Sequence, residues 1–128
     1  MPTLISPEVD TMGRLMVDAA YTVHRTWGPG LLEKIYETCF CHELSKRGLN
    51  FRQQVYIPLV YDGHYFEQGL ILDVLVEETV ICELKAQEAQ PVFVSQLLSQ
   101  LKLARKHLGY LINFNVPLIK HGIKRFVA

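Results

Sequence analysis

A short, otherwise apolar part of the sequence contains two carboxylates and one amine. Asp73 lies within the apolar run of residues 70–76, and Glu83 and Lys85 close a second apolar run that begins at Val80. Charged side chains in such runs are costly to bury unless they pair with an opposite charge or bind a metal ion. Carboxylate oxygens suit the hard cations Mg²⁺ and Mn²⁺. A lysine beside such an ion would position or activate an attacking water, or balance the charge of a phosphate.

The geometry of this group depends on how two predicted strands are connected. The two-residue period of a strand places Glu83 and Lys85 on the same face. A two-residue turn at residues 77–78 would place Asp73 opposite Cys82, and Glu83 would then face away from it. A joint site for the carboxylates therefore requires a three-residue connection, a bulge, or strands that separate at this point. The alternative is a structural ion pair between Lys85 and one of the two carboxylates.

Two predicted helices carry further polar candidates. Glu33 begins the second helix within the spacing Gly30-x-x-Glu33-x-x-Tyr36, where an acid also complements the positive end of the helix dipole. Gln96 and Gln100 lie one turn apart on the helix that follows the Glu-x-Lys strand. Glutamine at such positions is commonly a polar surface residue.

Hydrophobic periodicity and turn residues predict the order helix, helix, three antiparallel strands, helix and strand. The Asp62-Gly63 pair predicts a hairpin turn, and Pro58 predicts an edge position or an irregularity in the first strand. A turn at residues 121–122 precedes a last small strand. The expected helices span residues 7–26, 31–47 and 94–108, and the expected strands span residues 55–61, 65–76, 79–85 and 110–114.

The same patterns predict two details of the helices. Leu32, Ile35, Cys39 and His42 form the expected stripe along the second helix. Gly109 marks the expected end of the third helix, because glycine readily adopts the conformation that terminates helices.

Composition limits the class of protein. The 128 residues correspond to one domain, residues 1–128, and a hydrophobic fraction of 49% is enough for a core. No apolar stretch approaches the roughly 20 residues that cross a bilayer, and the N-terminus lacks the pattern of a signal peptide. The three cysteines have no CxxC spacing, which is typical of a protein in the reducing cytoplasm and disfavours a disulfide framework. We therefore expect no membrane segment and a cytoplasmic location.

Charge is balanced overall but unevenly placed. Thirteen Lys and Arg residues balance 13 Asp and Glu residues, yet Glu88 is the last carboxylate in the chain. Among the cations that follow, Lys102, Arg105 and Lys106 are candidates for contacts with the phosphates of nucleic acid. The alternative is an ordinary solvated face, because the chain as a whole is not basic.

Taken together, these residues resemble the GxxExxY proteins, a family within the PD-(D/E)XK nuclease superfamily. The resemblance extends from about residue 9 to residue 127. It is carried by the Gly30, Glu33 and Tyr36 spacing, the strand at residues 53–61, Asp73, the triplet at residues 83–85, Gln96 with the two leucines that follow, and residues 111–117.

This resemblance implies an α/β (α+β) fold with a restriction-endonuclease-like core, in which a central mixed β-sheet is flanked by helices. It implies that Asp73 and Glu83 are metal ligands and that Lys85 is the catalytic lysine. It further implies that Glu33 is a helix-borne acid of the site and that Gln96 is a polar residue of the following helix.

The sequence departs from the family pattern in the supporting residues. Ile71 replaces an arginine that many members carry, Phe93 replaces a histidine, and Gln100 replaces a tyrosine. These changes bear on rate and substrate preference more than on metal binding.

Two functional hypotheses follow. The first is a Mg²⁺- or Mn²⁺-dependent nuclease that hydrolyses phosphodiester bonds in nucleic acid, with DNA as the expected substrate and with Glu33 contributing directly or through water. Because so small a core leaves little room for a DNA groove, we expect a symmetric homodimer or a partner protein that supplies target recognition. The second is a catalytically silent nuclease fold that serves as a binding or regulatory module.

Overall fold

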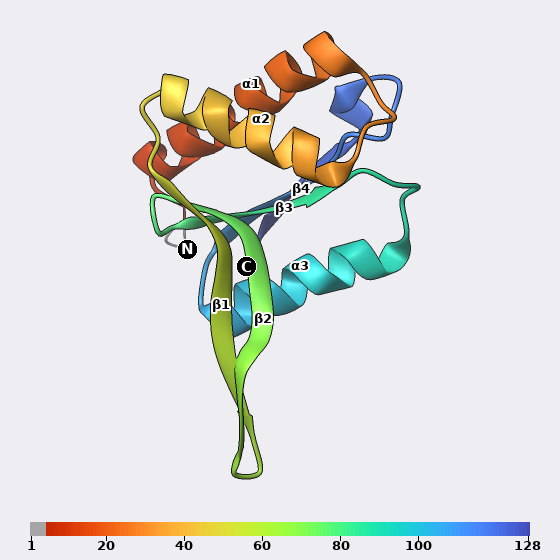
Figure 1. Ribbon diagram of the computed structural model, residues 1–128. Helices are drawn as coiled ribbons and strands as arrows, with labels where there is room; N and C mark the ends of the chain where they lie inside the picture. The colour runs from red at the N-terminus through yellow and green to blue at the C-terminus, as the bar shows by residue number, and fades with distance from the viewer. Residues whose placement is uncertain (1–4) are drawn as a thin grey trace.

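The computed structural model describes residues 5–128; residues 1–4, which contribute to the predicted absence of a signal peptide, lie outside the described residues. A five-stranded sheet in the order β1-β2-β3-β4-β5 has α1 and α2 on one face and α3 on the other (Figure 1). This confirms the predicted mixed sheet with helices on both sides. The elements are α1 (Pro7–Trp27), α2 (Glu33–Lys46), β1 (Phe51–Tyr61), β2 (His64–Val76), β3 (Val80–Lys85), α3 (Pro91–Ala104), β4 (Leu108–Asn113), the short 3₁₀ helix η1 (Ile119–His121) and β5 (Ile123–Val127).

The two central strands β3 and β4 are parallel, and the other neighbouring pairs are antiparallel. A parallel pair needs a long crossover, which α3 supplies between β3 and β4. Helices on both sides bury the central strands, and β3 is accordingly apolar except for Glu83 and Lys85. The chemistry-bearing residues thus lie near the carboxyl end of a central strand.

Two hydrophobic cores fill the space between the sheet and the helices. The larger core lies under α1 and α2, and the smaller core lies under α3. Helix α1 contributes Met16, Ala19, Ala20 and Val23 to the larger core, at the spacing expected for one helix face. Among residues 5–128, no helix has both the length and the apolar character needed to cross a membrane.

Tyr36 ties the connection between α1 and α2 to the core. Its side chain is fully buried, and its ring stacks on Phe114 with 4.6 Å between ring centroids. The Tyr36 hydroxyl donates to the carbonyl oxygen of Gly28 at 2.5 Å and accepts from the amide of Leu31 at 3.1 Å. This residue therefore fixes the chain immediately before Glu33, which begins α2.

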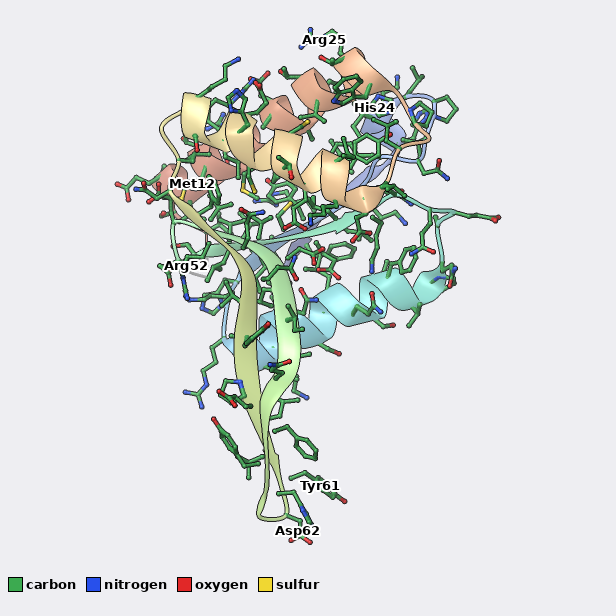
Figure 2. All side chains as sticks on the ribbon, viewed as in Figure 1. Met12, His24, Arg25, Arg52, Tyr61 and Asp62 are labelled. Carbon is green, nitrogen blue, oxygen red and sulfur yellow. The ribbon has the colours of Figure 1, made fainter. Side chains whose placement is uncertain are left out.

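The hairpin between β1 and β2 matches its sequence signals. Asp62 and Gly63 form a two-residue turn in which both have positive φ, 48° and 81°. The edge strand β1 shifts register between Ile57 and Leu59, which is the irregularity predicted at Pro58. The tip of the hairpin, with Tyr61 and Asp62, extends well beyond the layers of the fold (Figure 2).

The connection between β2 and β3 has three residues. Val76 pairs with Val80, and the register continues to Val74 opposite Cys82. Glu77 and Glu78 adopt left-handed conformations with φ of 50° and 55°. This is one of the three arrangements that the sequence required for Asp73 and Glu83 to share a site.

The stripe predicted for α2 is wrong. Leu32 precedes the helix and is 77% exposed, Ile35 is 44% exposed, and His42 is also exposed. The buried face instead contains Tyr36 and Phe40, together with Cys41 and Leu44. The error arises because two apolar stripes lie on this helix, and only packing against α1 and the sheet selects one of them.

The predicted end of the third helix is also wrong. Helix α3 begins at Pro91 and ends at Ala104, and Arg105 follows in the left-handed conformation with φ of 58°. Gly109 lies inside β4, where a side chain would come within 3.0 Å of Leu97 and 3.2 Å of Leu101. Glycine at this position allows close packing of helix and strand and does not end the helix.

The variant Tyr36→Phe tests the role of the Tyr36 hydroxyl. It should lower the free energy of unfolding by about 1–3 kcal/mol, because the stack remains but buried polar groups lose their partner. Urea denaturation provides the measurement. The control Tyr61→Phe, at a side chain that is 76% exposed, should change stability by less than about 0.5 kcal/mol. Equal effects of the two variants would contradict this role.

Candidate active site

Asp73 occupies the point at which β2 and β3 stop pairing through their backbones. The last backbone pair is Val74 with Cys82, and the amide of Leu84 donates to Asp73 Oδ2 at 2.9 Å. On the β1 side of β2, Gln54 adopts the left-handed conformation, with φ of 52°, and does not pair with Asp73 through the backbone. The strands therefore separate here, and the carboxylate takes the place of a backbone acceptor. Such local irregularities often re-aim side chains at functional sites.

Glu83 and Lys85 face the α3 side of the sheet, as the strand period predicts. Glu83 is only 6% exposed, and Lys85 Nζ lies 3.5 Å from Glu83 Oε2. The same amine lies 4.5 Å from the ring centroid of Phe93, in a cation–π contact. A charge-assisted hydrogen bond would measure about 2.7–2.9 Å, so the ion pair is loose. It leaves Glu83 Oε1 without a hydrogen-bond partner among the described residues.

The environment of Glu83 favours its protonated form in the absence of a cation. Burial raises the pKa of Glu83 to about 8, and the charge of Asp73 and a hydrogen bond with Asp73 add to the increase. Lys85 and the amide of Gln100 act in the opposite direction on this pKa. The two carboxylates are thus close enough to repel each other strongly, and a bound divalent cation would relieve that repulsion.

A cavity of about 480 Å³ opens between the end of β3 and α3. Gln96 and Gln100 lie on one helix face, but Gln96 is exposed whereas Gln100 is only 5% exposed. The resemblance predicts Gln96 at the site and marks Gln100 as a departure from the family pattern. The i,i+4 spacing of the two residues is the sequence signal that both reach the same place. The cavity is lined by Leu70, Ile71, Glu83, Lys85, Val92, Ser95, Gln96, Ser99 and Gln100.

Glu33 is near the site but does not line this cavity. Burial raises the pKa of Glu33, the charges of Asp73 and Glu37 raise it further, and Lys85 lowers it. Within residues 5–128, no group of three or more His, Cys, Asp or Glu side chains is arranged to hold a metal ion. The predicted set of three carboxylate ligands is therefore not assembled, and the pair Asp73 and Glu83 remains.

This pair nevertheless fits a divalent cation. Mg²⁺ keeps several of its waters and is commonly bound through only one or two carboxylates. The unpartnered Oε1 of Glu83 is a buried hard-oxygen donor beside a second carboxylate. Both features match the ligand chemistry of Mg²⁺ and Mn²⁺.

The predicted phosphate-binding cations lie away from the carboxylates. Lys102, Arg105 and Lys106 are at the carboxyl end of α3, and Lys106 Nζ donates to the carbonyl oxygen of Glu78 at 2.7 Å. Arg105 and Lys106 line a different cavity, beside the β2–β3 turn. Lys85 lies at the other end of β3. The structure does not bring these cations to the site.

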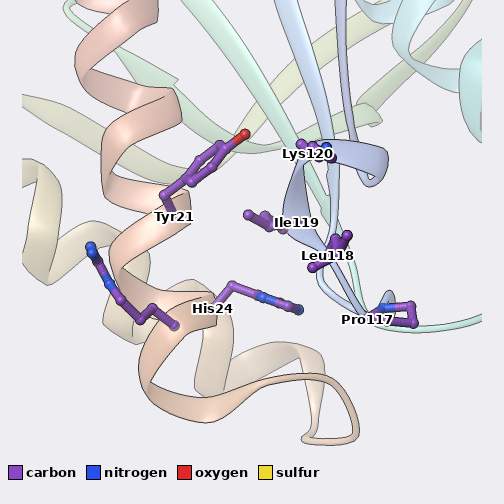
Figure 3. Close-up of a pocket in the computed structure, with 7 residues that line it drawn as sticks. Tyr21, His24, Pro117, Leu118, Ile119 and Lys120 are labelled. Carbon is purple, nitrogen blue, oxygen red and sulfur yellow. The ribbon is translucent and has the colours of Figure 1, made fainter.

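A further cavity of about 360 Å³ lies between α1 and the segment around η1. Tyr21 and His24 project from α1 toward residues 117–120 (Figure 3). The ring of His24 is buried, and its Nε2 lies 2.7 Å from the carbonyl oxygen of Val116. The lining residues of this cavity include no carboxylate. His24 thus has a structural partner, and the cavity offers no metal-binding chemistry.

The raised pKa of Glu83 predicts a pH-dependent stability of the metal-free protein. The folded state retains this proton up to about pH 8, whereas the ordinary carboxyl pKa is 4.5. Its contribution to stability is therefore fully present below about pH 4.5 and is lost as the pH rises toward about 8. Chemical denaturation in chelator at several pH values should show this loss in the wild type and a smaller loss in Glu83→Gln. The exposed-site control Glu67→Gln should follow the wild type; a Glu83→Gln profile identical to both would contradict the assignment.

Comparison with known protein families identifies a nuclease superfamily. The family model described as the PD-(D/E)XK nuclease superfamily matches residues 10–126, a range that includes Asp73, Glu83 and Lys85. Neither the curated proteins nor the solved structures include a match. A match over nearly the whole chain, on a mixed sheet flanked by three helices, shows that the chain belongs to the PD-(D/E)XK nuclease superfamily.

Proposed function

We propose that this protein is a divalent-metal-dependent nuclease that hydrolyses phosphodiester bonds in nucleic acid, with DNA as its substrate. The observation that carries the proposal is the buried Glu83 with Asp73 next to it and Lys85 beside it, where Glu83 and Lys85 line a cavity in a chain of the nuclease superfamily. The more specific resemblance to the GxxExxY family is part of the same proposal.

Asp73 and Glu83 would hold the cation, Mg²⁺ or Mn²⁺. When bound, the ion supplies positive charge that stabilises the charge developing on the scissile phosphate. Asp73 is already oriented by the amide of Leu84, and Glu83 by its rigid central strand. Such orientation before binding lowers the cost of assembling a metal site. Glu33, the first residue of α2, would contribute to the site through a bridging water molecule.

Lys85 would orient the attacking water and stabilise negative charge on the phosphate. Its side chain is 13% exposed, so the amine faces the cavity from a mostly desolvated position. The ring of Phe93 and the loose pair with Glu83 hold it there without a tight hydrogen bond. Gln96, exposed at the cavity, would donate to or accept from the substrate.

The distant cations set a minimum length for the substrate. Along α3 the cavity extends from Val92 to Gln100, and Lys102 and Arg105 follow two and five residues later. At a rise of about 1.5 Å per residue, Arg105 lies about 8 Å along the helix axis from Gln100. A substrate that contacts both regions must therefore extend beyond the nucleotide at the cavity. A second copy of the chain or a partner protein would supply target recognition.

The alternative is a nuclease fold that binds nucleic acid or a partner without turnover. The Lys85–Glu83 ion pair favours it, because this contact is also the contact of a merely structural lysine. Ile71 at the cavity, in place of the family's arginine, favours it as well.

Single substitutions at the carboxylate–lysine group test the nuclease. Asp73→Asn and Lys85→Met should each reduce cleavage of labelled DNA by at least about 100-fold, because each removes a charge that acts on the transition state. Cleavage should require Mg²⁺ or Mn²⁺ and stop with chelator; an RNA of the same sequence tests the substrate. The matched control Asp62→Asn, at the hairpin tip, should cleave like the wild type. Metal binding without cleavage of either nucleic acid would favour the silent module.

Neutralising the far cations tests the length of the substrate site. The double variant Lys102→Gln, Arg105→Asn should raise KM for a duplex of about 20 base pairs and leave kcat nearly unchanged, since these side chains lie away from the cavity. Asn is chosen because it tolerates the left-handed backbone at position 105. A chromogenic phosphodiester of a single nucleotide, too short to reach them, should show no change. Equal effects on both substrates would refute the proposed path.

A further inference from the structure

The cavity beside Lys85 contains two buried acceptor oxygens without partners. They are Glu83 Oε1 and Gln100 Oε1, and among the buried side-chain atoms of the described residues these two stand out as lacking any hydrogen bond. Both residues are more than nine-tenths buried and line the same cavity. An unsatisfied buried acceptor lowers the stability of the folded protein. Two such oxygens at one cavity indicate that a ligand satisfies both.

The chemistry of that ligand follows from the oxygens themselves. Once Glu83 is ionised, as it must be to bind a cation, neither its carboxylate nor the amide carbonyl oxygen of Gln100 can donate a hydrogen to the other. A divalent cation accepts both as ligands, since carboxylate and carbonyl oxygens suit Mg²⁺ and Mn²⁺. Two carboxylates balance the charge of the ion, so a neutral third ligand completes the set without adding repulsion.

We infer that Gln100, and not Gln96, is the glutamine of the metal site, and that its carbonyl oxygen is a third protein ligand beside Asp73 and Glu83. This rests on the proposed metal-dependent function and deepens it. The amide ligand also explains why residues 5–128 contain no metal-binding group of three or more His, Cys, Asp or Glu side chains, since the third ligand is none of these.

The test measures Mn²⁺ binding by calorimetry and the melting temperature of the metal-free protein. Gln100→Leu should weaken Mn²⁺ binding by at least about tenfold. It should leave the melting temperature of the metal-free protein unchanged or higher, because an apolar group replaces an unsatisfied acceptor. A structural role for Gln100 predicts the reverse: a lower melting temperature with Mn²⁺ affinity intact.

Two further variants isolate the oxygen atom. Gln100→Glu keeps an oxygen at the same distance along the side chain and should bind Mn²⁺ within about threefold of the wild type or more tightly. Gln68→Leu, on the exposed part of β2, is the matched control and should leave both measurements unchanged. Wild-type Mn²⁺ affinity in Gln100→Leu, or a tenfold loss in Gln96→Leu with none in Gln100→Leu, would overturn the inference.

The outcomes separate this inference from the proposed function. If the wild type binds no Mn²⁺ and cleaves nothing, the metal-dependent nuclease fails and the ligand role of Gln100 fails with it. If the wild type binds Mn²⁺ and cleaves DNA while Gln100→Leu binds the ion equally well, the nuclease stands and the role of Gln100 is refuted.

Discussion

The repulsion between two carboxylates held beside each other is the constraint on which the site depends. Glu83 is buried on a central strand, and Asp73 is fixed next to it by the amide of Leu84. Burial and the neighbouring charge of Asp73 together disfavour ionisation of Glu83, and the single amine of Lys85 is too loosely placed to neutralise both carboxylates. This arrangement lowers the stability of the fold, and it creates a place that attracts a cation.

The rest of the structure positions this group. The parallel pair β3 and β4 ends at the site, and in open sheets ligands bind beyond the carboxyl ends of such strands. The carbonyl oxygen of Lys85 accepts from the amide of Phe114 at 2.9 Å, and Asn113 Nδ2 donates to the carbonyl oxygen of Gln87 at 2.6 Å. These contacts anchor the chain that leaves β3, so Lys85 is held from both its side chain and its backbone.

The Gly-x-x-Glu-x-x-Tyr spacing combines two different roles. Tyr36 is a packing residue that stacks on Phe114 and closes the loop before α2. Because that loop is fixed, Glu33 begins its helix near Asp73 and Lys85, close enough for their charges to act on it. One buried ring thus connects the helical layer to the residue that follows β4, although the ring itself carries no chemistry.

Local sequence patterns were sufficient to predict the order of elements, the Asp62-Gly63 hairpin, the irregular edge strand at Pro58 and the common face of Glu83 and Lys85. These features depend on local periodicity and turn chemistry, which neighbouring residues decide. Local patterns did not settle five other features: the face that α2 buries, the end of α3, the separation of β2 from β3 at Asp73, the burial of Gln100 and the position of Lys102 beyond the cavity. Each of these depends on packing between segments far apart in the chain, and such packing selects among alternatives that local patterns leave equal.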